Sequence, residues 1–100
     1  MYYIYILHSE SSGAYYTGYT DNLERRVWEH NHSPHNTFTS KHRPWRLKAA
    51  FSVSEDNGIA MQTEKFIKKQ KSRTFIEKIC ESEVFVLPMA QLVRVPKLRD

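Results

Sequence analysis

YYIYILH (Tyr2–His8) and AYYTGYT (Ala14–Thr20) are the two stretches that decide the fold of this 100-residue chain, and together they contain all six of its tyrosines. Aromatic residues favour strands, and the polar Ser9–Gly13 segment between the two stretches is typical of a turn, so we predict a β-hairpin. Pairing Tyr5 with Tyr16 would centre the turn in that segment. Directly opposed residues share a face of a sheet, which would place two phenols side by side. Taken alone, the tyrosines are equally explained as strand formers on a half-buried surface.

A short helix is predicted after the hairpin, from about residue 22 to residue 30. Asp21 is its expected N-cap, with Glu24 completing a capping box. Arg26 and His30 then lie four residues apart on neighbouring parts of one helical face, near the apolar stripe. Arginine and histidine are uncommon core residues. Either this face borders a cleft, or Arg26 extends to solvent and His30 is a hydrogen-bonded interior histidine.

The rest of the chain predicts a single α+β domain, a small three-stranded antiparallel sheet flanked by helices. A polar loop over Asn31–Pro44 leads to an alternating third strand, Trp45–Ser54, which places Leu47, Ala49, Phe51 and Val53 on one face. Two helices are expected over about 59–71 and 73–80. We assign residues 1–82 to the domain. Residues 83–100 form a C-terminal tail that is apolar but broken by two prolines, and its pattern predicts no element.

Glu64 lies at the margin of the apolar stripe of the second predicted helix. An acidic residue at that position is either a functional group beside a cleft or an ordinary i,i+4 partner of Lys68. Its sequence position does not distinguish these two readings.

Composition narrows the class of protein. The chain carries a formal net charge of +4 and has a pI near 9.3, with basic residues gathered around 41–48 and 65–73. Local basic clusters favour a polyanionic partner, although lysines also simply solvate helices. The apolar runs are too short for a membrane span, and no signal peptide is evident. A single cysteine excludes an internal disulfide and favours a reducing, cytoplasmic setting.

The spacing of these residues resembles the GIY-YIG nuclease superfamily, and within it the small standalone bacterial proteins. The resemblance runs from Tyr2 to about Ile79. The two signature tripeptides fall on Tyr3-Ile4-Tyr5 and Tyr16-Thr17-Gly18. Arg26, His30 and Glu64 match the family's catalytic arginine, helix histidine and metal-binding glutamate, and the segment 41–45 (KHRPW) is also similar.

The chain also departs from the family pattern. Tyr3 stands at the glycine of the first signature, and Thr17 at the isoleucine of the second. Tyr19 occupies a position where several family nucleases have a lysine that assists catalysis. An asparagine that some members carry near the C-terminus has no counterpart. The resemblance therefore implies the fold more strongly than it implies turnover.

The resemblance implies a metal-dependent DNA endonuclease that acts in DNA repair or recombination, with structure selectivity as a further expectation. Glu64 would hold a single Mg²⁺ or Mn²⁺ ion, and no small-molecule cofactor is expected. Arg26 would neutralise the charge of the transition state, while Tyr5 or Tyr16 would accept a proton with the help of His30. Gly18 is the structural residue of the motif. The expected contacts with the DNA backbone are Lys41, Arg43, Lys68, Lys69 and Lys71.

Three alternatives stay open. The domain would bind nucleic acid without independent turnover, or His30, His32, His35 and His42 would form a metal module, although their spacing matches no standard zinc pattern. In the third reading the apolar tail would mediate a homodimer or another protein contact, which is compatible with nuclease activity.

Overall fold

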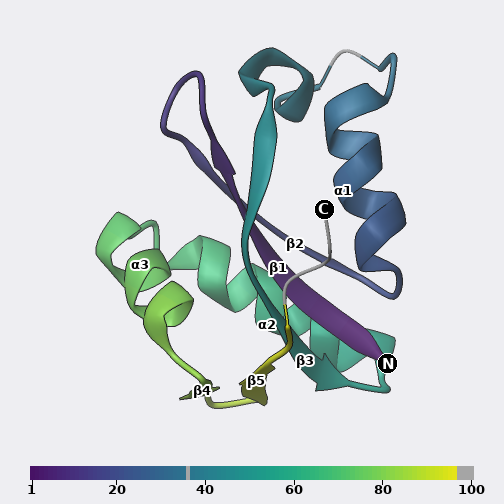
Figure 1. Cartoon of the computed structure of the whole chain (residues 1–100). Coiled ribbons are helices and arrows are strands. Elements are labelled where there is room, and N and C mark those ends of the chain that lie inside the picture. Colours follow the sequence, from purple (N-terminus) through teal and green to yellow (C-terminus); the bar gives the residue numbers. More distant parts are fainter. Residues whose placement is uncertain (36, 97–100) are drawn as a thin grey trace.

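A computed structural model describes residues 1–35 and 37–96 of the chain. Its centre is a five-stranded antiparallel sheet in the order β2-β1-β3-β5-β4, with helices on both faces (Figure 1). The elements are β1 (Tyr2–Ser9), β2 (Tyr15–Thr20), α1 (Leu23–His32), the 3₁₀ helix η1 (Thr39–His42), β3 (Trp45–Ser54), α2 (Asn57–Lys69), α3 (Arg73–Glu81), β4 (Val84–Val86) and β5 (Gln91–Arg94).

The predicted α+β class is confirmed, but the sheet has five strands and not three. The two additional strands come from the segment that the sequence left without an assignment. β5 pairs with β3 through Phe51 and Arg94, and Leu87 and Leu92 are buried in the core. Strands of three and four residues show too few alternations to be identified from pattern alone.

The hairpin register differs from the predicted one by two residues. Tyr5 lies opposite Gly18, and Tyr16 lies opposite Leu7. Because side chains alternate with a period of two, a shift of two residues keeps Tyr5 and Tyr16 on the same face. Their ring centroids are 6.4 Å apart. The turn sits further along the chain than expected because Gly13 supplies the positive φ of 77° at which it closes.

The third strand begins and ends as predicted, but its alternation is interrupted. Ile6 pairs with Ala49 while Leu7 pairs with Leu47, so Lys48 is the extra residue of a β-bulge. The bulge moves Leu47 to the face opposite Ala49. The prediction that both lie on one face was therefore wrong.

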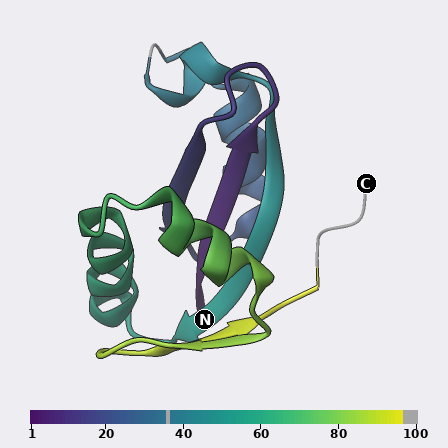
Figure 2. The same cartoon turned by 90° about the vertical axis from the view of Figure 1, so that its left-hand side faces the viewer.

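Two layers of side chains enclose the sheet, and β1 lies between them. Ile4 and Ile6 pack on the side of α2 and α3, against a cluster that includes Ile67 and Ile79. Tyr5 and Leu7 point to the other side, where Leu23 of α1 and Trp45 pack. Figure 2 shows α2 and α3 on one face of the sheet and α1 on the other. Strand β2 lies at the end of the strand order, next to β1, and is therefore an edge strand of the sheet.

The helix α1 is capped by Asn22 and not by Asp21 as predicted. The Asn22 side chain accepts a hydrogen bond from the Arg25 backbone N–H at 3.1 Å. The helix then runs two residues further than expected, to His32. Asp21 instead forms a long ion pair with Arg25 at the surface.

Candidate active site at the β2 edge of the sheet

The ring of Tyr5 extends across Gly18, which explains the glycine. A Cβ atom at position 18 would overlap the Tyr5 hydroxyl oxygen and Cζ and would lie 2.9 Å from Cε1. The Tyr5 side chain thus reaches over the edge strand β2 because its cross-strand neighbour has no side chain. The two signature positions are a matched pair.

The Tyr5 hydroxyl ends at the imidazole of His30. The phenol oxygen and Nε2 are 2.7 Å apart in a buried hydrogen bond. Burial, followed by the charge of Arg26, lowers the pKa of His30 to about 4. The imidazole is therefore neutral near pH 7, and the two residues form a neutral hydrogen-bonded pair.

The end of α1 that carries His30 is fastened to the neighbouring segment by polar side chains. Arg43 donates to the carbonyl oxygens of His30 and Ser33, at 2.7 and 2.6 Å. Asn31 exchanges two hydrogen bonds with the backbone of Trp45, at 3.0 and 2.7 Å. These contacts fix the position of the imidazole relative to β1.

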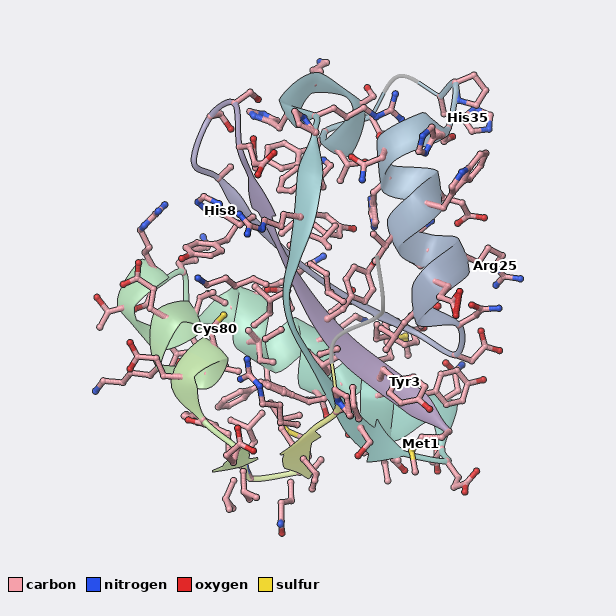
Figure 3. All side chains as sticks on the ribbon, viewed as in Figure 1. Met1, Tyr3, His8, Arg25, His35 and Cys80 are labelled. Carbon is pink, nitrogen blue, oxygen red and sulfur yellow. The ribbon has the colours of Figure 1, made fainter. Side chains whose placement is uncertain are left out.

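Arg26 lies one helical turn before His30, at the rim of the site. Its Nη1 donates to Glu29 at 3.0 Å, and its side chain is partly exposed. Arg25, the residue before it, points away from the sheet into solvent (Figure 3). Only the arginine at position 26 is thus aimed at the site.

Glu64 and Lys68 reach the same edge from α2, on the opposite face of the sheet. Their side chains form an ion pair of 3.6 Å, in which the Glu64 side chain is 17% exposed and that of Lys68 is 45% exposed. The Lys68 ammonium lies 4.9 Å from the centroid of the Tyr16 ring, and the Tyr16 ring lies 4.8 Å from that of His30. Side chains from both helices therefore approach the Tyr16 ring at the β2 edge.

The pKa of Tyr5 responds to its burial and to the charges of Arg26, Tyr16 and Glu64. Burial is the main cause that raises the pKa of Tyr5 above its usual value, and Tyr16 and the Glu64 carboxylate also raise it. The Arg26 guanidinium opposes this shift. With its pKa raised in this way, the Tyr5 phenol is protonated near pH 7.

A cleft of about 640 Å³ opens beside this group. Among its lining residues are Tyr16, Arg26, His30, Trp28 and Phe38. The last two were missed by the sequence analysis. A tryptophan on the polar side of a predicted helix, four residues before a histidine, was the available signal.

The basic residues predicted to contact DNA are in different situations. Lys68 is at the site itself, whereas Lys41 on η1, Lys69 at the end of α2 and Lys71 just after that helix are exposed. Arg43 is the exception, because its guanidinium is engaged with the carbonyl oxygens at the end of α1. Its visible role is to position His30.

The four histidines of the alternative metal module do not converge. His30 bonds to Tyr5, His32 stacks on Trp28, and His42 contacts Ser12 at 2.8 Å. Figure 3 shows His35 beyond the end of α1. Over residues 1–35 and 37–96, no three side chains of His, Cys, Asp or Glu gather as a metal site would require. The histidine module is therefore not supported.

The fold and the site together define a small α+β domain with two phenols, a guanidinium, an imidazole and a carboxylate at one sheet edge. The family model described as the GIY-YIG catalytic domain matches residues 1–78. A UPF0213 protein of Bacillus cereus (strain ATCC 10987 / NRS 248) is 33% identical over 76 residues, which cover 76% of this chain and 78% of that protein. A UPF0213 protein of Halobacterium salinarum is 36% identical over 69 residues, which cover 69% of this chain and 87% of that protein.

The chain belongs to the GIY-YIG family. The family is one of nucleases, which are phosphodiesterases, and a nuclease domain implies a DNA substrate. GIY-YIG nucleases generally use a divalent metal ion. In the part of the chain that the structure describes, no helix is long and apolar enough to cross a membrane.

Glu64 fits the requirements of a Mg²⁺-type ion. Hard divalent cations accept a single protein carboxylate when phosphate oxygens and waters complete the shell. The Glu64 carboxylate is partly exposed, and among the described residues its ion pair is with the half-exposed ammonium of Lys68. Displacement of that ammonium would free its oxygens for an ion.

Proposed function

We propose that the chain is a metal-dependent DNA endonuclease whose reaction is centred on the Tyr5–His30 pair, with Arg26, Tyr16 and Glu64 around it. The observation that supports this proposal is the buried Tyr5–His30 hydrogen bond at the β2 edge, beside a cleft that Tyr16 and Arg26 also line. The Lys68 ammonium, which pairs with Glu64, lies over the Tyr16 ring at the same edge. Hydrolysis forms a new P–O bond from water, breaks one bridging P–O bond and transfers a proton to the leaving oxygen. The edge supplies groups for the first two events, whereas solvent water would give the leaving oxygen its proton and would take back the proton held by His30.

Tyr5 and His30 would move the proton of the attacking water. Because the pKa of Tyr5 is raised, a free phenolate is not formed near pH 7. The phenol oxygen instead takes a proton from water as its own proton passes to Nε2 of His30, 2.7 Å away. His30 can accept this proton because its imidazole is neutral, with Nδ1 carrying the hydrogen in the required tautomer.

Arg26 and Glu64 would handle the phosphate charge. The partly exposed guanidinium of Arg26 can turn from Glu29 to the non-bridging oxygens, as charge-assisted hydrogen bonds favour. Glu64 would hold Mg²⁺ or Mn²⁺, which supplies Lewis-acid stabilisation of the phosphate and the leaving oxygen when bound. Lys68 would provide a cation close to Tyr16. It would take the part of the lysine that assists catalysis in several family nucleases, because Tyr19 occupies the position of that lysine in this chain.

The test is cleavage of labelled single-stranded, duplex and branched DNA by the purified protein with Mg²⁺ or Mn²⁺. Glu64→Ala and Arg26→Ala should each abolish cleavage, and both should retain the far-UV spectrum and melting temperature of the wild type. Tyr5→Phe should abolish it too, whereas Tyr16→Phe should leave measurable turnover. Loss of cutting in Tyr16→Phe but not in Tyr5→Phe would reverse the roles of the two phenols. Cleavage that survives both Glu64→Ala and Arg26→Ala would refute the site.

The second candidate is a DNA-binding domain without independent turnover. It is favoured because Tyr19 stands where several family nucleases have a lysine that assists catalysis. The exposed Lys41, Lys69 and Lys71 would bind the phosphate backbone in either case, and their contacts predict an affinity that falls steeply with salt. Salt-sensitive binding without cleavage of any DNA under any metal condition would favour this candidate.

The nuclease proposal also includes a role in DNA repair or recombination, on the basis of the nuclease family. It includes a cytoplasmic location, on the basis of the single cysteine.

A further inference from the structure

Two aromatic side chains are left exposed in the cleft beside the candidate active site. Trp28 is 59% exposed and Phe38 is 51% exposed, whereas Trp45, the other tryptophan, is 4% exposed. Both exposed rings line the same cleft, which also contains Arg26 and His30. Large exposed apolar groups that gather at one cavity are typical of a binding site.

Both rings are held in place before any ligand arrives. Trp28 stacks on His32, with centroids 4.6 Å apart and planes 15° apart, and His32 Nδ1 lies 2.9 Å from the Trp28 carbonyl oxygen. Phe38 packs on His42, with centroids 4.3 Å apart, and lies near-parallel to Tyr16 at 6.4 Å. Both rings nevertheless stay more than half exposed and line the cleft, and their contacts reduce the entropy lost on binding.

We propose that this cleft binds one unpaired base of the substrate, which stacks on Trp28 against the wall formed by Phe38, next to the phosphodiester held by Arg26. This inference rests on the nuclease function proposed above and specifies its substrate: a strand with an unstacked base beside the cleaved bond.

The chemistry of the cleft favours a base over other flat ligands. Arg26 supplies a guanidinium for the adjacent phosphate, and Glu29 supplies a carboxylate that accepts hydrogen bonds at the rim. Stacking on an aromatic ring requires an open face of the base, and within an intact duplex both faces are covered by neighbouring base pairs. A regular duplex would therefore contact the basic surface without entering the cleft.

The test measures binding separately from cleavage. Full-length wild type, Trp28→Ala, Trp28→Phe and Met61→Ala are titrated, with a chelator present, into three labelled DNAs: a short single strand, the same strand with abasic sites, and its duplex. Met61→Ala is the matched control because Met61 is an exposed apolar residue of α2 outside the cleft. Trp28→Ala should weaken single-strand binding by about 5- to 100-fold, the range of one base stacked on an aromatic ring. Trp28→Phe should recover most of this loss.

Binding of the abasic strand and the duplex should change by less than about 2-fold in Trp28→Ala, because neither offers a base to stack. The single strand should also quench the fluorescence of wild type but not that of Trp28→Phe, in which only the buried Trp45 emits. Equal losses on all three DNAs, or no loss on any, would overturn the inference.

The inference and the function proposed above can fail separately. Base-dependent binding through Trp28 without metal-dependent cleavage by wild type would support the cleft and overturn the nuclease. Cleavage that requires Glu64, with single-strand binding unaffected by Trp28→Ala, would overturn the cleft alone.

Discussion

Tyr5 and Gly18 act as one unit at the residue scale. The phenol occupies the space that any side chain at position 18 would need, and its hydroxyl reaches His30 only along this path. A side chain at position 18 must therefore displace the ring.

We expect Gly18→Ala to destabilise the fold by about 1–3 kcal/mol, the usual cost of overpacking a core, and to reduce cleavage beyond what its stability loss explains. Urea denaturation of a double-mutant cycle with Tyr5→Leu checks the cause. In the Tyr5→Leu background, Gly18→Ala should cost much less, because leucine is too short to reach over β2. An undiminished cost in that background would locate the strain elsewhere.

His30 gives the stability of the fold a pH dependence. Its pKa is about 4 in the folded protein and about 6.5 when unfolded, so between these values the unfolded chain binds a proton that the folded chain does not. The free energy of unfolding should therefore fall as the pH falls from about 6.5 to about 4, by at most about 3 kcal/mol from this residue.

Urea denaturation at several pH values, compared between wild type and His30→Gln, isolates the contribution. Glutamine keeps a hydrogen bond to Tyr5 but does not titrate, so the difference between the two proteins should shrink as the pH falls. His35→Gln, at an exposed histidine, is the control. A constant difference between pH 7 and pH 4 would contradict the assignment.

At the scale of elements, the start of α1 depends on Asn22 and not on its acidic neighbour. The Asn22 side chain satisfies a free backbone N–H at the first turn, while Asp21 contributes an exposed ion pair. We expect Asn22→Ala to cost about 1 kcal/mol and Asp21→Ala to cost less than about 0.5 kcal/mol. Thermal denaturation of the two variants compares them directly, and the reverse order would restore Asp21 as the cap.

The same helix shows how far local pattern carries a prediction. Asp and Asn are equally good caps, so the choice between adjacent residues was decided by backbone geometry that no local rule contains. The helix itself and the bounds of the third strand were predictable because their periodicity is strong. The hairpin register and the bulge at Lys48 were not, because both depend on where Gly13 turns the chain and on pairing with a distant strand.

At the scale of the whole molecule, the last strands complete the core. Leu92 of β5 is fully buried, and β5 hydrogen-bonds to β3 beside Phe51. We expect Leu92→Ala to cost about 2–5 kcal/mol, and Val86→Ala, at an exposed position on β4, to cost less than about 0.5 kcal/mol. Urea denaturation distinguishes the two, and a negligible effect of Leu92→Ala would show that residues 1–82 hold the core by themselves.

The candidate site was largely predictable because its residues occur at the spacing of a known family, while its shape was not. Tyr5, Tyr16, Arg26, His30 and Glu64 were predicted as site residues from the chain, and the structure places them around the β2 edge, while their roles stay a prediction. The engagement of Arg43 and the exposure of Trp28 and Phe38 follow from how the 31–44 loop folds over α1. No periodicity constrains such a loop.

The placement of the site between helices on opposite faces of the sheet has a consequence for synthesis of the protein. Both phenols, the guanidinium and the imidazole lie within the first 30 residues, but Glu64 comes from α2, which must dock on the other face. On the proposed mechanism, a chain still emerging from the ribosome carries four of the five groups and no complete site. Cleavage of DNA would therefore begin only after α2 has been made and has docked on the sheet.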